Sequence, residues 1–123
     1  MDSRRVEYTV IKDKGIVRAS IYCTCYDAIE EFNKRFMEHS TSSLMVGIDS
    51  CDSRFMMPYS FSVVAKLHPE DKWDEEEGKR IALRKLATKY NHSLDKHLHN
   101  MYNAMMKSMD KMHGYLVAHK MEV

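Results

Sequence analysis

The segment VEYTVIKDKGIVRASIYCTC, residues 6–25, decides the fold, because it holds two strand-like runs joined by a short turn. The first run alternates apolar and polar residues, which is the period of a half-buried strand. The turn ends in Gly15, which can take the positive φ that a tight hairpin needs. The second run is β-branched, and its better-buried face is predicted to carry Val17, Ala19, Ile21, Cys23 and Cys25. The segment therefore predicts an antiparallel hairpin.

A short helix and further strands are expected after this hairpin. Asp27 can cap a helix that ends near His39, and its apolar residues recur at three- to four-residue steps. A short strand is expected at residues 44–48. A longer strand is expected at residues 55–66, interrupted near Pro58.

Two helices are expected in the last third of the chain. The first follows Asp74, which precedes a glutamate by three residues in a pattern like a capping box. Residues 91–93 (Asn-His-Ser) break its apolar pattern, and a second helix is expected from residue 94 to about 113. Gly114 is expected to end this helix, and residues 115–118 are expected to form either a last short strand or an apolar clasp.

Length and composition bound the class of protein. The 123 residues predict one α+β domain, residues 1–123, with a three- to four-stranded antiparallel sheet, one short helix and two C-terminal helices. Nineteen basic residues against 18 acidic ones give a net charge of +1, which argues against a general nucleic-acid coat. The charged N-terminus and the lack of a long apolar run predict a cytoplasmic protein that does not enter a membrane.

No catalytic or metal-binding constellation stands out. Cys23 and Cys25 have a spacing that structural zinc sites rarely use, and Cys51 is the only other thiol. The seven histidines do not form the His-x-x-x-His pattern that places two ligands on one helix face. We therefore expect no catalytic residue, metal or cofactor, and no enzymatic activity.

A methionine-rich stripe marks the second C-terminal helix. Methionine packs adaptably against irregular partners, and the stripe follows nearly heptad spacing. It is therefore either a core face of this chain or an interface with a partner protein or a second copy. The residues expected to bind a partner are Met101, Met105, Met109 and Met112.

The densest positive group lies at residues 79–89. Arg80 and Arg84 are one helical turn apart, and together with Lys85 they could grip a phosphate-bearing ligand. The competing interpretation is a solvated surface neutralised by two i, i+4 ion pairs, Glu75–Lys79 and Glu76–Arg80.

The stretch AKLHPEDKWD, residues 65–74, with the Gly and the Ala-Leu pair that follow, resembles a motif of small uncharacterised bacteriophage and prophage proteins. The resemblance covers about 20 of the 123 residues. The sequence departs from the motif in two ways. Leu67 stands before His68 without the usual cysteine, and Trp73 replaces the commoner Phe. The motif is also well explained as a strand-to-helix joint. Its residues are His68, Pro69, Asp71, Trp73, Asp74 and Gly78.

Together these features lead to one functional expectation and one alternative. The resemblance implies a small phage-type accessory protein that binds a host factor without chemistry of its own, such as an inhibitor of a CRISPR nuclease. The alternative is a nucleotide- or nucleic-acid-binding protein that uses the basic residues 79–89.

Overall fold

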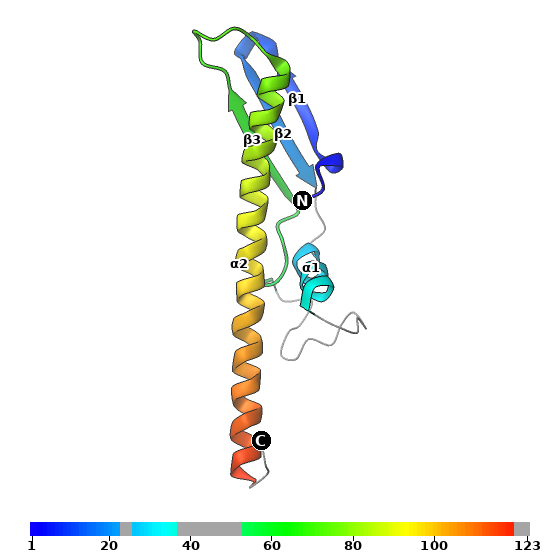
Figure 1. The fold of residues 1–123 in the computed structure, drawn as a ribbon, viewed down its shortest axis with the longest axis vertical. Helices are drawn as coiled ribbons and strands as arrows, with labels where there is room; N and C mark the ends of the chain where they lie inside the picture. Colours follow the sequence, from blue (N-terminus) through cyan, green and yellow to red (C-terminus); the bar gives the residue numbers. More distant parts are fainter. Residues whose placement is uncertain (23–25, 37–52, 120–123) are drawn as a thin grey trace. The chain divides into compact units, whose positions relative to one another are not determined.

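The computed structural model describes residues 1–22, 26–36 and 53–119. The described residues form three strands, a short α-helix and one long α-helix, which confirms the α+β class (Figure 1). The elements in chain order are β1 (Glu7–Ile11), β2 (Ile16–Tyr22), α1 (Asp27–Phe36), β3 (Ser60–Lys66) and α2 (Glu75–Ala118).

Contacts divide the chain into two compact units. Unit 1 comprises Met1–Thr24 and Pro58–Ser93, and it holds the sheet and the first part of α2. Unit 2 comprises Cys25–Met57 and Leu94–Val123, and it holds α1 and the rest of α2.

The sheet of unit 1 is antiparallel throughout, in the order β1-β2-β3. Gly15 closes the first hairpin with a φ of 62°, which confirms the predicted turn. The described part of the predicted buried face is also confirmed, since Val17, Ala19 and Ile21 are almost fully buried. The other two members of that face, Cys23 and Cys25, lie outside the described residues.

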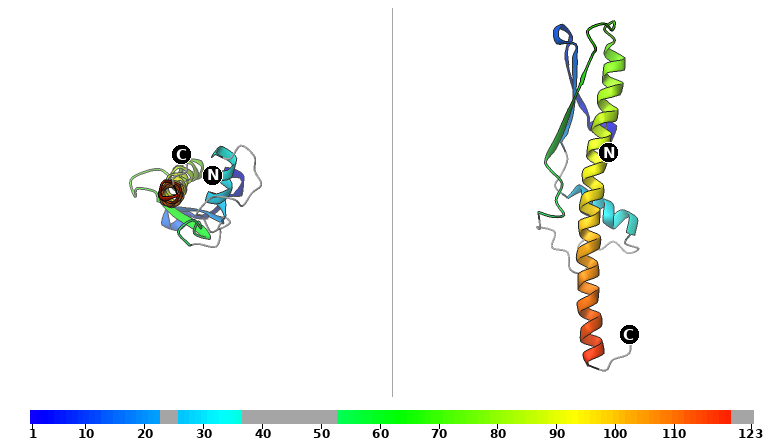
Figure 2. Two further views of the ribbon diagram at one scale, coloured as in Figure 1. Left: turned by 90° about the horizontal axis from the view of Figure 1, so that it is seen from below. Right: turned by 90° about the vertical axis from the view of Figure 1, so that its left-hand side faces the viewer.

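The first part of α2 covers one face of this sheet, as Figure 2 shows. Gly78 permits the approach, because a Cβ atom there would lie 2.7 Å from Cγ2 of Val17. Further along the helix, Ala82 and Leu86 are completely buried. The ring of Tyr90 meets that of Phe61 edge-on, with 5.7 Å between centroids. These contacts form the core of unit 1.

The two predicted C-terminal helices are a single helix. Residues 91–93 are helical, Gly114 lies inside the helix, and residues 115–118 are its last turn rather than a strand. Placing even a glycine inside a helix costs only about 1 kcal/mol relative to alanine, so tertiary packing can override the low helix propensity of these residues. The exposed Asn91 and His92 lie between the buried Tyr90 and His97, and burial on both sides favours a continuous helix.

Unit 2 has its own small core. The predicted helix after the hairpin is confirmed over Asp27–Phe36, with Ala28, Ile29 and Phe32 buried. Its expected end near His39 lies outside the described residues. Phe55 is also buried, and Asn100 Nδ2 donates a hydrogen bond to the carbonyl of Arg54 at 2.9 Å. The strand predicted at residues 44–48 lies outside the described residues.

The long strand predicted from residue 55 begins only at Ser60. Residues 53–55 form a turn instead. Pro58 lacks the N–H that a strand ladder requires, which fits a start beyond it. From Ser60 onward the predicted alternation holds, with Phe61 and Ala65 facing the core.

Candidate functional site

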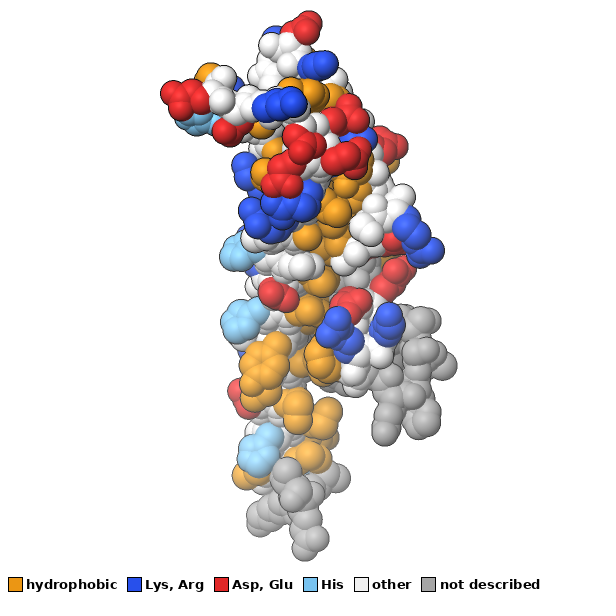
Figure 3. All heavy atoms as spheres, turned by 45° about the horizontal axis from the view of Figure 1, so that its top comes forward, with side chains coloured by type: hydrophobic (Ala, Val, Ile, Leu, Met, Phe, Trp, Pro, Cys, Tyr) orange, Lys and Arg blue, Asp and Glu red, His pale blue; other side chains and the backbone are white. Residues whose placement is uncertain are grey.

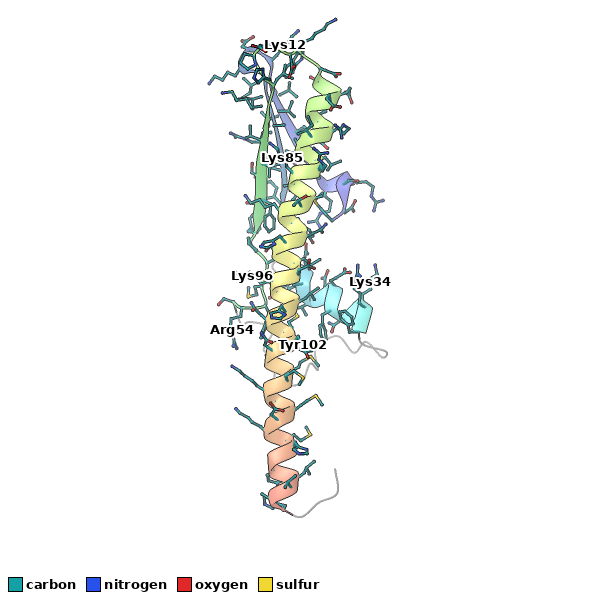
Figure 4. The ribbon with its side chains drawn as sticks, turned by 60° about the vertical axis from the view of Figure 1, so that its left-hand side comes forward. Lys12, Lys34, Arg54, Lys85, Lys96 and Tyr102 are labelled. Atoms are coloured by element: carbon teal, nitrogen blue, oxygen red, sulfur yellow. The ribbon has the colours of Figure 1, made fainter. Side chains whose placement is uncertain are left out.

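The C-terminal part of α2, within unit 2, has no buried residue between Tyr102 and Ala118. At 100° per residue, seven of its residues fall within roughly 140° of the helix circumference. We call these seven the exposed apolar face: Tyr102, Met105, Ser108, Met109, Met112, Tyr115 and Leu116. Figure 3 shows hydrophobic side chains gathered toward this end of the chain, and Figure 4 labels Tyr102.

No charged residue lies on this face. The segment contains three charged residues, Lys107, Asp110 and Lys111, and all three fall on the remaining part of the helix circumference. Tyr102, Met109 and Met112 are each more than half exposed, at 58%, 58% and 53%. Exposed apolar surface that is contiguous and free of charge is typical of an interaction site.

The exposed apolar face continues a heptad pattern that begins further upstream, where Met101 is buried. Leu94, Leu98 and Met101 precede it with the 4-3 spacing of a heptad, and Met101 is completely buried within unit 2. The same spacing then runs on through Met105, Ser108, Met112 and Tyr115. Heptad spacing keeps one side of a helix directed at a neighbouring helix.

The four methionines expected to bind a partner are therefore not equivalent. Met101 is completely buried, so it belongs to the core of its own chain and is not available to a partner. Met105 is half-buried, whereas Met109 and Met112 are exposed to solvent. The sequence interpretation missed Tyr102, Tyr115 and Leu116, although they continue the same helical period.

A second feature lies in unit 1, where α2 runs beside β3. In the part of the chain that the structure describes, an open hollow of about 460 Å³ is lined by Arg84, Lys85, Thr88, Lys89 and His92. We call this the basic hollow. Lys85 Nζ donates a hydrogen bond to the carbonyl of Val64 at 3.3 Å, and Lys89 Nζ donates to that of Ser62 at 3.2 Å. Lys85 is labelled in Figure 4.

Arg80 does not line this hollow. Its guanidinium is bound twice by Glu77, at 2.8 Å and 2.5 Å, and this pair replaces the predicted one between Glu76 and Arg80. The hydrogen bond from Arg80 lowers the pKa of Glu77 and raises that of Arg80. The predicted ion pair between Lys79 and Glu75 is present at 3.6 Å. The predicted ligand group thus separates into a neutralised Arg80 and the Arg84 and Lys85 of the hollow.

The strand-to-helix joint is held by its own hydrogen bonds. The Leu67 N–H donates to the carbonyl of Gly15 at 2.7 Å, which ties the end of β3 to the hairpin turn. The Asp71 N–H donates to the carbonyl of His68 at 2.9 Å. Asp74 Oδ1 accepts from the Glu77 N–H at 3.2 Å, as expected of an N-cap. Trp73 is half-exposed and lines a hollow of about 190 Å³ with His68, Asp71, Asp74 and Gly78, whereas Pro69 does not line it.

Two findings concern only the part of the chain that the structure describes. No group of three or more His, Cys, Asp or Glu side chains there could hold a metal ion. No helix there is both long and apolar enough to cross a membrane. All three cysteines lie outside the described residues.

The fold and the two surfaces define an α+β protein with an exposed apolar face and a basic hollow. No protein-family model, curated protein or solved structure matches the chain. The resemblance to phage and prophage proteins stays a prediction from the sequence.

Proposed function

We propose that this chain is a non-enzymatic binding protein that docks onto another protein through its exposed apolar face. One observation carries the proposal: seven residues of α2 share a charge-free face, and none of them is buried. Association would remove this apolar surface from water, which is the main driving force of most protein–protein contacts. The resemblance adds the context of a phage accessory protein, so the proposed partner is a host protein, such as a defence nuclease.

The energetics of the segment support a role in docking. The part of α2 from Tyr102 to Ala118 has no buried residue, so it gains little of the tertiary packing that supplies most helical stability. A partner that covered Met105, Met109 and Met112 would supply that packing. Flexible methionine side chains also adapt to partners of different shape.

The experiment compares two variants with the same type of substitution on opposite sides of the helix. The first carries Met109→Glu and Met112→Glu, within the exposed apolar face. The control carries Asn103→Glu, which lies half a turn around the helix from Met112. Partners captured from host lysate by the unaltered protein are identified, purified and titrated against each variant.

We expect the double variant to weaken binding by at least about tenfold, since a buried carboxylate costs more than 1.4 kcal/mol. The control should bind as the unaltered protein does. Equal binding by all three proteins would contradict the proposal. Sedimentation over a range of protein concentrations identifies the rival occupant, a second copy of this chain, by a dimer that the double variant fails to form.

A further inference from the structure

The positive charges along the first part of α2 fall into two groups with different surroundings. Lys79 and Arg80 are each paired with a glutamate, as described above. In the described ranges 1–22, 26–36 and 53–119, no ion pair is formed by Arg84, Lys85 or Lys89. The positive charge of Arg84 also lowers the pKa of Glu77, but the carboxylate oxygens of Glu77 are hydrogen-bonded to Arg80. Among the residues that the structure describes, no carboxylate therefore pairs with the positive charges of the basic hollow.

The two lysines of the hollow are held in place by the sheet. Among the described strands β3 lies at an edge of the sheet, and the carbonyls of Ser62 and Val64 accept hydrogen bonds from α2. Four residues of helix rise about 6 Å. Two residues of strand rise about 6.6 Å. Because these distances match, Lys85 and Lys89 reach successive outward carbonyls, and each ammonium keeps further N–H donors for a ligand.

From this arrangement we infer that the basic hollow binds the phosphate groups of a nucleotide or a nucleic-acid strand. The Arg84 guanidinium can bind two phosphate oxygens at once, and the two anchored ammonium groups add point charges on the same side. Ordering of Lys85 and Lys89 by the backbone lowers the entropic cost of binding. The inference is independent of the exposed apolar face, which lies in unit 2.

The net charge of +1 limits the size of the ligand footprint. A protein that coats nucleic acid needs a basic excess over much of its surface. Here the uncancelled charge is local, so the hollow is expected to neutralise about three phosphates, one for each of Arg84, Lys85 and Lys89.

Arg84→Gln is the most direct test, because the Arg84 side chain makes no hydrogen bond or ion pair among the described residues. The matched control is Arg80→Gln, which removes the same charge one helical turn away from a residue already paired with Glu77. Three probes are titrated by calorimetry: pyrophosphate, adenosine triphosphate and a twelve-nucleotide oligothymidylate. Each titration is made at 50 and 200 mM NaCl.

Binding of at least one probe is expected, weakened about tenfold by Arg84→Gln and less than twofold by Arg80→Gln. A nucleic-acid strand as the ligand gives a log–log salt slope of about −2 for the oligonucleotide, from about three phosphates on a single strand. A nucleotide gives tighter binding of the triphosphate than of the oligonucleotide. The inference is overturned if no probe binds at millimolar concentration, or if both variants weaken binding equally. The Met109→Glu, Met112→Glu variant should bind the probes as the unaltered protein does, because it alters only the exposed apolar face. A failure of phosphate binding would therefore leave the proposed protein-docking function unaffected.

Discussion

Gly78 on α2 and Val17 on β2 approach so closely that a Cβ atom at position 78 would lie 2.7 Å from Val17 Cγ2. Val17 is 1% exposed and β-branched, so its methyl group has little room to move. We therefore expect Gly78→Ala to lower the free energy of unfolding by about 1–3 kcal/mol, as overpacking does. Urea denaturation followed by circular dichroism measures the change.

Gly114 provides the matched control for this prediction. It lies in the same helix, and a Cβ atom there would have no neighbour within 4 Å. Gly114→Ala should raise helix stability by up to about 1 kcal/mol, because alanine is the better helix former. Combining Gly78→Ala with Val17→Ala tests the contact itself, since removal of the methyl group should relieve the clash. If Gly78→Ala also stabilised the protein, the close approach would be contradicted.

The hairpin, its turn and the helix N-cap of unit 1 were predictable, because each is determined by residues close together in the sequence. Alternation gave the hairpin, Gly15 gave its turn, and Asp74 gave the cap of α2. The continuity of α2 through residues 91–93 was not predictable in this way. Polar residues favour a break locally, but the burial of Tyr90 and His97 on either side decides the outcome.

The candidate surfaces show a similar division. Heptad spacing indicated the helix face that carries Met101, Met105 and Met112. The spacing does not show which of these residues are buried within their own chain and which are exposed. Proximity along the helix grouped Arg80 with Arg84. Sequence spacing allows Arg80 to pair with either Glu76 or Glu77. The side-chain geometry of the folded helix selects Glu77.

Met101 and Met109 differ in burial, so the same substitution should lower the free energy of unfolding by very different amounts at the two positions. Met101 is completely buried, so Met101→Ala should cost about 2–5 kcal/mol through lost burial and the cavity left behind. Met109 is 58% exposed, so Met109→Ala should change the free energy of unfolding by less than about 0.5 kcal/mol. Thermal or urea unfolding at low protein concentration measures both. Similar costs at the two positions would mean that residue 109 is covered within its own chain.

The N-cap of α2 gives a third prediction. Asp74 Oδ1 accepts a hydrogen bond from the Glu77 N–H at 3.2 Å, which satisfies one of the free donors of the first turn. Asp74→Ala should cost about 1 kcal/mol, whereas Asp74→Asn and Asp74→Ser should retain most of the stability because both side chains can cap. Urea midpoints of the three variants measure the effect. An alanine variant as stable as the asparagine variant would show that the cap contributes nothing.

The Glu77–Arg80 pair predicts a small pH dependence of stability. Hydrogen bonding to Arg80 lowers the pKa of Glu77 in the folded protein below its ordinary value of 4.5. The folded state thus binds its proton less readily than the unfolded state does. The contribution of the pair is therefore present above pH 4.5 and is lost as the pH falls through the lowered pKa. Both side chains are exposed, so the effect should also shrink in 1 M NaCl.

Carboxyl chemical shifts measured by NMR between pH 2 and pH 7 report this pKa directly. In the unaltered protein Glu77 should titrate below its ordinary range, and Arg80→Gln should return its pKa toward 4.5. Arg84→Gln should raise the pKa of Glu77 by less than Arg80→Gln does, because Arg84 acts on Glu77 only through space and more weakly than Arg80 does. A Glu77 titration that is identical with and without Arg80 would show that the two side chains are not paired in solution.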